Sequence, residues 1–509
     1  MAMVKLEISL KRVQTFIFEV PRLRAMLGAN ALIGQTMRHE LPKLIGSRGK
    51  PLDWPAGLGE EYPDDPLHAT VDPDDPAALY GKGILARDGG HFIAVFENEP
   101  AARDFLHAAE EQLAQRLPGV LYEVSLERKA GPRETQLMDL PVLQVCQETG
   151  RGPASEQEKE RWQARSVTHR QQWGDRFYAG GTKDIIGLMR SALYPDKARH
   201  WSEPDDLAQL AAGGYLALIH ADGNGIGKRY NAWKKKAPSD DPIDQEAHGE
   251  AFFHSMRVAV RRAVVAALTG TFTTQNGKRP YEILMLGGDD LLLLCRANQA
   301  LEFGERYARE LTEYRLADGP PLNVAIGIAI AQQSYPLHRL HELAESLASS
   351  AKRLYRALPD ADKTSVIDWQ VVTPSWFEGV AEARRQGEQV AYTVGDKEET
   401  LLLTGRPYRV SGAGGLEGLS TAARRLDARE EGKAARSPLR GLRGACEGGR
   451  LMGEMAFARL PKDVQTQLGW AEGKLWEPLG VGSGAMYATR ALDIIGIREI
   501  AGLGSKKND

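Results

Sequence analysis

Two adjacent aspartates stand in a glycine turn between two apolar runs, within ILMLGGDDLLLLCRA at residues 283–297. A tight hairpin needs glycine because its backbone enters conformations that other residues avoid. Gly287 and Gly288 are therefore typical of a turn, whereas turn chemistry has no need of both Asp289 and Asp290. A purely structural turn is the commoner explanation for such a tetrapeptide alone, so the surrounding elements must decide.

A third acid, Asp222, follows the apolar stretch YLALIHA at residues 215–221, which is typical of a buried strand. The GGDD turn joins the next two predicted strands, and in a ferredoxin-like sheet these lie side by side with the first. We therefore expect Asp222, Asp289 and Asp290 to converge at one edge of the sheet. Clustered carboxylates repel one another unless cations neutralise them, and all-oxygen ligands suit Mg²⁺ or Mn²⁺. The pattern predicts a two-metal site for phosphoryl or nucleotidyl transfer, with glycines that let a nucleotide approach the backbone.

Lysines near these acids raise the question of phosphate binding. Lys352, on the predicted helix SLASSAKRLYRAL, can reach a triphosphate as a point charge, with a solvated helix lysine as the alternative. GNGIGKR around Lys228 does not match a phosphate-binding loop, because Asp222 and Arg229 stand where that pattern needs Gly and Ser or Thr. A run of three lysines follows, at Lys234, Lys235 and Lys236. We interpret this run as a solvated loop and leave a phosphate contact open.

The order of predicted elements indicates an α+β fold with two ferredoxin-like (cyclase/palm-type) domains. In the first half, residues 3–10 alternate as a strand and the Asp88-Gly89-Gly90 segment marks a hairpin. From residue 213 the order is β-α-β-β-α-β, with an added helix and strand. We expect a degenerate cyclase-like domain at 1–140, a connecting segment at 141–210, the GGDD palm at 211–375 and a C-terminal helical domain at 376–509.

Composition excludes several classes of protein. With a formal net charge of −3 over 509 residues, the whole surface does not attract nucleic acid, so RNA contacts would need local patches or partner subunits. Cys146, Cys295 and Cys446 are too few and too distant for a disulfide framework or a zinc site. Charged residues interrupt the N-terminus, so it is no signal peptide, and no apolar run reaches the ~20 residues of a membrane span. We expect a cytoplasmic protein.

Several stretches together resemble one family. Four of them, HADGNGIGK, PYEILMLGGDDLLLL, NVAIGIAIA and AESLASSAKR, resemble a palm domain. It is the palm domain of the large polymerase–cyclase subunit of type III CRISPR effector complexes. That domain is related to GGDEF and class III nucleotidyl cyclases. The family's first, degenerate cyclase-like domain is similar to KRVQTFIFEVPRLRAMLGANALIG. Its zinc-binding region resembles PVLQVCQETGRGPAS, and its C-terminal helical domain resembles RPYRV with SPLRGLRGACEGGR. The resemblance spans most of the chain.

The resemblance implies synthesis of cyclic oligoadenylates from ATP, in an RNA-guided complex that target RNA switches on. It also implies two bound ions of Mg²⁺ or Mn²⁺. The implied site consists of Asp222, Asp289 and Asp290 as catalytic metal ligands, with Gly287, Gly288, Lys352 and Asn224 as nucleotide contacts. The implied partners are other subunits of the complex and, mainly through them, guide RNA and target RNA, with no membrane.

Three features depart from the family pattern. Asn224 stands where a second acid usually follows the first strand; its amide can still ligate or orient, but the site loses one charge. Cys146 stands alone where the family often has a cysteine set, so we expect no zinc. The first strand begins at once and none of the 11 histidines is followed by Asp, so we expect no HD nuclease domain and no DNase activity. His220, beside the acids, is expected to be a packed strand histidine.

Two other functions stay open. A catalytically silent scaffold subunit of such a complex is favoured by Asn224 and opposed by the complete GGDD turn. A diguanylate-type cyclase is opposed by Asp290, where that group has glutamate, and by Leu291, where it has phenylalanine. Metal-dependent turnover of ATP separates an enzyme from a scaffold, and preference for ATP over GTP separates the two enzymes.

Overall fold

The structure is a computed structural model of the whole chain. It describes residues 3–504 except for 21, 56–57, 59–63, 71, 127–145, 150–153, 155, 159–160, 180–191, 195–200, 205, 239, 274–276, 373–379, 395–396, 428–435, 471–472 and 480–484. Two of our expected domain boundaries, at 140 and 375, and most of the stretch 141–155 lie outside this part. The boundaries therefore stay predictions. No helix of the described residues is long and apolar enough to cross a membrane.

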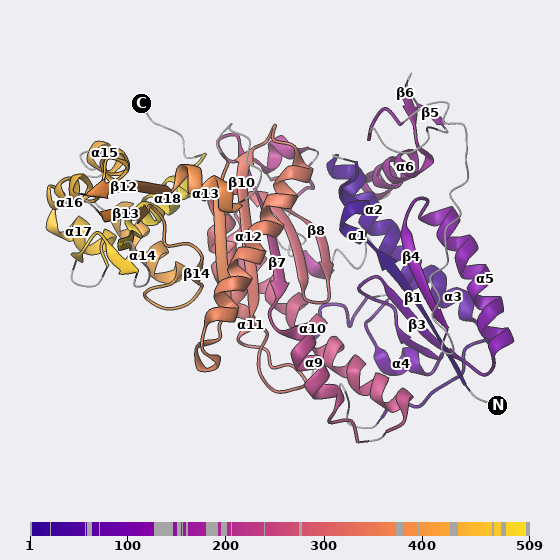
Figure 1. Cartoon of the computed structure of the whole chain (residues 1–509). Coiled ribbons are helices and arrows are strands. Elements are labelled where there is room, and N and C mark those ends of the chain that lie inside the picture. Colours follow the sequence, from indigo (N-terminus) through magenta and orange to yellow (C-terminus); the bar gives the residue numbers. More distant parts are fainter. Residues whose placement is uncertain are drawn as a thin grey trace.

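A four-stranded antiparallel sheet of order β2-β3-β1-β4 forms the N-terminal region (Figure 1). Its strands are β1 (Val4–Lys11), β2 (Ile84–Ala86), β3 (His91–Phe96) and β4 (Leu121–Leu126). Its helices are α1 (Val13–Phe18), α2 (Leu23–Gln35), the π-helical turn η1 (Thr36–Glu40), α3 (Leu41–Ile45), α4 (Pro76–Tyr80) and α5 (Glu99–Arg116). With β1 between β3 and β4, this is the ferredoxin-like order that we predicted.

The described part of the connecting segment contacts the N-terminal region through residues 165–179 and the central region through Tyr194, Ser202 and residues 207–210. It contains β5 (Glu156–Glu158), β6 (Arg161–Gln163), α6 (Arg165–Ala179) and the 3₁₀ turn η3 (Leu207–Leu210). Helix α6 crosses α2 at a glycine: a Cβ on Gly28 would lie 2.5 Å from the carbonyl oxygen of Arg170. Only glycine allows the two helix backbones to approach this closely.

A six-stranded sheet of order β14-β11-β10-β7-β9-β8 forms the centre of the molecule. Its strands are β7 (Tyr215–Gly223), β8 (Tyr281–Gly287), β9 (Asp290–Arg296), β10 (Val324–Gln332), β11 (Val366–Val371) and β14 (Tyr408–Arg409). Its helices are α9 (Ile226–Lys234), α10 (Pro242–Thr271), α11 (Ala297–Leu311), α12 (Leu337–Ala357) and the 3₁₀ turn η4 (Asp360–Asp362). The order β10-β7-β9-β8 is again ferredoxin-like, and α12 and β11 are the added helix and strand. The last strand, β14, comes from chain that we had assigned to the C-terminal domain.

The C-terminal region mixes helices with a sheet, whereas we had expected a mostly helical domain. The sheet, of order β12-β13-β16-β15, consists of β12 (Gln389–Val394), β13 (Lys397–Leu402), β15 (Glu477–Leu479) and β16 (Ala485–Ala488). The helices are α13 (Val380–Gly387), α14 (Leu416–Asp427), α15 (Arg436–Glu447), α16 (Arg450–Ala458), α17 (Lys462–Leu468) and α18 (Ala491–Ala501). The sheet was missed because its strands are short and β13, KEETLL, does not alternate apolar with polar residues.

Two hydrophobic cores lie on opposite faces of the central sheet, because successive side chains of a strand point to opposite sides. Ala217 and Ile219 of β7 belong to a core that continues into the C-terminal region. Leu216 and Leu218 belong to a second core, shared with α12 and the N-terminal region. Figure 1 accordingly shows the central sheet between the two outer regions. The central domain is thus held from both sides.

Candidate functional site

The candidate site lies at one end of the central sheet, where β7 ends and the β8–β9 hairpin turns. Asp222 is the second-to-last residue of β7, and Asp290 is the first residue of β9. The register pairs Ala221 with Leu291, so Asp222 and Asp290 are neighbours on adjacent strands. Gly287 pairs with Asp290 across the turn. Antiparallel pairing therefore brings these two predicted acids together, although 68 residues separate them in the chain.

Asp289 reaches the same point from the tip of the hairpin. A Cβ added to Gly223 would lie 2.5 Å from Oδ2 of Asp289, so this carboxylate packs against the backbone at the end of β7. The N–H of Gly223 donates a hydrogen bond to it. Gly288 supplies the left-handed backbone of the turn, with φ of 61°. Sequence reasoning missed Gly223, although its position directly after Asp222 was a usable signal.

Burial and repulsion by neighbouring acids make Asp289 and Asp290 difficult to ionise. Burial, followed by the charge of Asp222, raises the pKa of Asp289 above its usual range. Burial, Asp289 and Asp222 raise the pKa of Asp290 to about 7. Glu345 of α12 adds to the repulsion at Asp290 and was also missed; it precedes Lys352 by about two helical turns. Crowded carboxyl groups with raised pKa values are typical of functional sites, and a bound cation would relieve the repulsion.

Lys352 lies beside the acids. Its Nζ forms an ion pair with Oδ2 of Asp222. Its charge also works to lower the pKa of Asp289 and of Asp290, although burial has the larger effect on both. The side chains of Lys352 and Asp222 are 24% and 28% exposed, so an incoming ligand can reach the pair. The lysine expected near a triphosphate thus lies next to one of the expected metal ligands.

Two further polar residues beside the acids are buried. Asn224 is 3% exposed, and its Nδ2 has no hydrogen-bond partner among the described residues. Its backbone N–H donates to the carbonyl of Asn323 at 2.7 Å, which fixes the chain just beyond Asp222. His220 is packed on β7 as expected, 6.1 Å from the ring of His341, and burial lowers its pKa. Asn224 therefore offers an unused amide near the site, whereas His220 belongs to the packing of β7 on α12.

A cavity of about 150 Å³ lies beside the glycine turn. Gly287 and Gly288 form part of its wall, and α10 contributes Arg257 and Arg261. The N-terminal region closes it with apolar residues of α2 and with Asp88, in the turn between β2 and β3. The space next to the GGDD turn is therefore shared between the central domain and the N-terminal domain.

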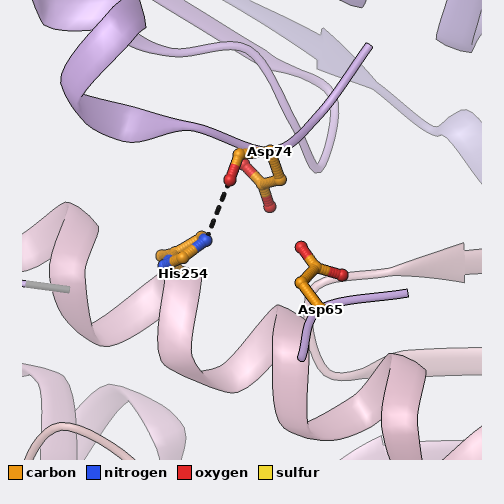
Figure 2. A group of neighbouring side chains, drawn as sticks. All are labelled: Asp65, Asp74 and His254. Carbon is orange, nitrogen blue, oxygen red and sulfur yellow. Dashed lines mark hydrogen bonds between the residues drawn. The ribbon is translucent and has the colours of Figure 1, made fainter. Parts of the chain in front are cut away.

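A second group of acids lies between α10 and the N-terminal region. Figure 2 shows Asp65, Asp74 and His254, whose ligand atoms lie within 4.8 Å of one another. Arginines already neutralise the carboxylates: Arg257 donates to Asp74 at 2.8 and 3.0 Å, and Arg261 donates to Asp65 at 2.6 Å and to Asp74 at 2.5 Å. Burial raises the pKa of Asp74, but the two arginines outweigh it and hold that pKa well below its usual range. We interpret this group as a salt-bridge cluster that joins the two domains.

The fold and the first group of acids define a class of protein. A ferredoxin-like sheet with one acid at the end of its first strand and two in the following hairpin is a palm-type domain. Residues 215–357 match the family model for the second palm domain of Cas10/Cmr2. The central part of the chain is therefore similar to a Cas10/Cmr2 second palm domain. The matched range runs from β7 to α12, so it includes Asp222, the GGDD turn and Lys352.

Solved structures of similar fold are Csm1 proteins. A Csm1–Csm4 cassette in complex with pppApApA aligns with 99% of this chain over 69% of its own, at 12% identity and a TM-score of 0.50. Csm1 from T. onnurineus aligns with 69% of this chain over 51% of its own, at 13% identity and a TM-score of 0.40. The Csm1–Csm4 cassette in complex with cA4 aligns at 13% identity and a TM-score of 0.39. This alignment covers 69% of this chain and 53% of the matched Csm1–Csm4 chain, so the present chain spans about half the length of that protein. These similarities concern the fold alone, and no curated protein matches the chain in sequence.

Proposed function

We propose that this chain is a nucleotidyltransferase that converts ATP to cyclic oligoadenylates within an RNA-guided type III CRISPR complex, activated by target RNA. The observation that carries the proposal is the convergence of Asp222, Asp289 and Asp290, with Lys352 paired to the first of them. The Cas10/Cmr2 palm match supports nucleotidyl transfer as the class of reaction. The structure of similar fold that holds pppApApA supports an adenine nucleotide as the substrate.

The chemistry of the three aspartates fits two ions of Mg²⁺ or Mn²⁺. They offer only carboxylate oxygens, which these hard cations prefer, and the raised pKa values of Asp289 and Asp290 indicate a surplus of negative charge. Bound there, such ions would supply Lewis acidity at the attacking hydroxyl and at the leaving pyrophosphate. Asn224, with its unused buried amide, is the residue that would orient the nucleotide.

In the proposed reaction, a ribose hydroxyl oxygen of one nucleotide attacks the α-phosphorus of an ATP. A phosphodiester bond forms, the bond to pyrophosphate breaks, and the hydroxyl proton passes to solvent. Lys352 would balance the charge of the triphosphate, and the Gly287–Gly288 turn would let the phosphates approach backbone N–H groups. The largely apolar cavity beside the turn would receive the nucleobase, since apolar walls suit its faces.

The proposed partners are other subunits of the complex, together with guide RNA and target RNA held mainly by those subunits. The net charge of −3 supports RNA binding by the other subunits, because this chain as a whole has no excess of cations for a phosphate backbone. The structure of similar fold is a Csm1 bound to a Csm4, which supports a protein partner of that kind.

A catalytically silent scaffold is the second candidate. It is favoured by Asn224, which stands where a further acid would strengthen metal binding, and by the ion pair that occupies Asp222. In that function the acids and Lys352 would neutralise one another without turnover. A diguanylate-type cyclase is the remaining alternative, and substrate preference tests it.

The test uses the complex that co-purifies with a tagged copy of the chain from its host. RNA complementary to the bound guide is added with ATP and Mg²⁺, and nucleotide products are identified by mass spectrometry. We expect oligoadenylates from the wild type and from Asp240→Ala, an exposed acid of the same domain. The double variant Asp289→Ala, Asp290→Ala should make none.

Three results would contradict the proposal. A complex that contains guide RNA and consumes no ATP would favour the silent scaffold. GTP consumed in preference to ATP would favour the diguanylate-type cyclase. Products that persist in the double variant would place the reaction elsewhere in the complex.

A further inference from the structure

Helix α9 begins four residues after Asp222 and has two unlike faces. On the packed face, Trp233 donates from Nε1 to the carbonyl of His248 at 2.7 Å and stacks on its ring at 4.2 Å. The opposite face and its C-terminal end are exposed and carry Lys228, Asn231, Ala232, Lys235 and Lys236. We call Lys228, Lys235 and Lys236 the α9 lysine face.

Helical periodicity places Lys228 and Lys235 on the same side of α9, about 10.5 Å apart along its axis. Their neighbours on that side are an amide and an alanine, so no acid interrupts the row. The next acids along the chain, Asp240 and Asp241, come after the turn that follows α9. Asp241 is occupied at the start of α10, where it accepts a hydrogen bond from the N–H of Ile243 at 2.7 Å.

The other cations of this segment are paired with acids. Arg229 donates to Asp318 at 2.8 and 2.6 Å, and Lys234 pairs with Glu246 at 3.3 Å. By contrast, the side chains of the α9 lysine face make no hydrogen bond or ion pair with any residue that the structure describes. Its three charges are therefore available to an anion from outside the chain.

The α9 lysine face starts at the candidate catalytic centre. A Cβ added to Gly223 would lie 2.8 Å from Cβ of Asp289 and 2.8 Å from Cγ1 of Ile226, the first residue of α9. The first turn of α9 is thus packed beside the acids, and a strand that leaves them along the helix meets Lys228 first and Lys235 next. The positive end of the helix dipole also lies on the side of the acids.

We propose that the α9 lysine face binds the phosphates of a single-stranded oligonucleotide that extends from the candidate catalytic centre. Phosphates of a stacked strand follow at ~3.4 Å, so ~10.5 Å of helix corresponds to about three nucleotides. The strand is either the growing oligoadenylate or a bound RNA, because both present the same phosphodiester chain. Only the origin of the strand rests on the function proposed above.

The test compares the full-length triple variant Lys228→Gln, Lys235→Gln, Lys236→Gln with a matched control, Lys43→Gln, Lys82→Gln, Lys462→Gln. The control removes three exposed lysines from other parts of the chain and changes the net charge equally. Binding of fluorescein-labelled tetra-adenylate, and of a mixed-sequence RNA of about 20 nucleotides, is measured by fluorescence anisotropy from 50 to 200 mM salt. EDTA is present, so no turnover occurs, and equal melting temperatures show that all proteins are folded.

For a single strand, the loss of three phosphate contacts makes the slope of log K against log salt concentration shallower by about 2. We therefore expect the affinity of the wild type and of the control to fall about 20-fold more than that of the triple variant across this salt range. An effect on both ligands identifies a strand as short as the product, and an effect on the longer RNA alone identifies an RNA backbone. Equal binding by the triple variant and the control for both ligands would overturn the proposal. Because binding is measured without turnover, an inactive enzyme would count against the proposed function only.

Discussion

The backbone of Gly223 packs closely against the carboxylate of Asp289. A methyl group at position 223 would lie 2.5 Å from Oδ2 and 2.8 Å from Cβ of Asp289. Such a methyl group cannot be accommodated unless the side chains of Asp289 and Ile226 shift. The position of the acids therefore depends on a residue that has no chemistry of its own.

We predict that Gly223→Ala lowers metal-dependent turnover of ATP by about 100-fold, because misplacing a catalytic group by ~1 Å has effects of that size. The protein should still fold, which a thermal melt checks beside the turnover assay. Gly227→Ala is the matched control, since a Cβ at Gly227 meets no atom within 4 Å. Equal turnover by the two variants would show that the contact with Asp289 is unimportant.

The pKa of Asp290 links the stability of the metal-free protein to pH. In the folded chain this pKa is about 7, whereas an unfolded aspartate titrates near 3.9. Between these values the unfolded chain has lost the proton and the folded chain has kept it, so stability falls as pH rises from about 4 to 7. Above about pH 7 Asp290 is ionised in the folded chain, and this ionisation lowers the free energy of unfolding by at most about 4 kcal/mol.

We predict that Asp290→Asn removes this loss of stability at high pH. In EDTA, the variant and the wild type should differ little in free energy of unfolding near pH 4, because Asp290 is then neutral in the folded chain. At pH 8 the variant should be more stable by about 1–4 kcal/mol. Urea unfolding at a series of pH values measures the difference, and a difference that is independent of pH would contradict the assigned pKa.

Among the elements, α10 joins the central domain to the N-terminal domain. It is 30 residues long, and Glu246 near its start pairs with Lys5 of β1 at 2.9 Å. Further along, Arg257 and Arg261 pair with buried acids of the N-terminal region. Since the same helix lines the cavity beside the GGDD turn, these pairs set the distance between α10 and the domain that closes the cavity.

We predict that Arg261→Met lowers the free energy of unfolding by about 3–5 kcal/mol, because Asp65 and part of Asp74 lose their cation in a buried place. The matched control is Arg262→Met, at the next position of α10. Arg262 pairs with Asp64 at 3.7 Å, and that acid is 76% exposed, so its loss should cost about 0–1 kcal/mol. Chemical denaturation of both variants measures the two costs, and equal costs would mean that the buried cluster does not hold the domains.

In the whole molecule, the central sheet has a hydrophobic core on each face. The face that carries Leu216, Leu218, Leu292 and Leu294 shares its core with the N-terminal region. The opposite face shares its core with the C-terminal region. The central domain therefore shares a core with its neighbours on each face, although its strand order is complete.

We predict that a fragment of residues 211–509 aggregates or exposes apolar surface. It lacks the N-terminal part of one core and also the acids that neutralise Arg257 and Arg261. Size-exclusion chromatography and binding of a hydrophobic dye, with the full-length chain as the control, measure the effect. A monomeric fragment that melts at the same temperature as the full chain would show that the central domain folds independently.

Sequence patterns were sufficient for the features that arise within short stretches of chain. The apolar run before Asp222, the glycine turn at Gly287 and Gly288, and the element order predicted the α+β fold and the approach of Asp222 to the GGDD turn. These features are local, because strand alternation and turn geometry are properties of a few consecutive residues. The resemblance of the palm motifs also agrees with the family match.

Tertiary structure alone decided the contacts between distant segments. The pair of Lys352 with Asp222 joins positions 130 residues apart, and the pair of Arg257 with Asp74 joins positions 183 apart. Strand β14 enters the central sheet from beyond residue 400, and Gly223 at the end of β7 meets Asp289 in the β8–β9 turn. Such contacts depend on which surfaces pack together, and the hydrophobic periodicity of the sequence does not predict this. The candidate acids could therefore be identified from the sequence, whereas packing determines which cations and which glycine lie beside them.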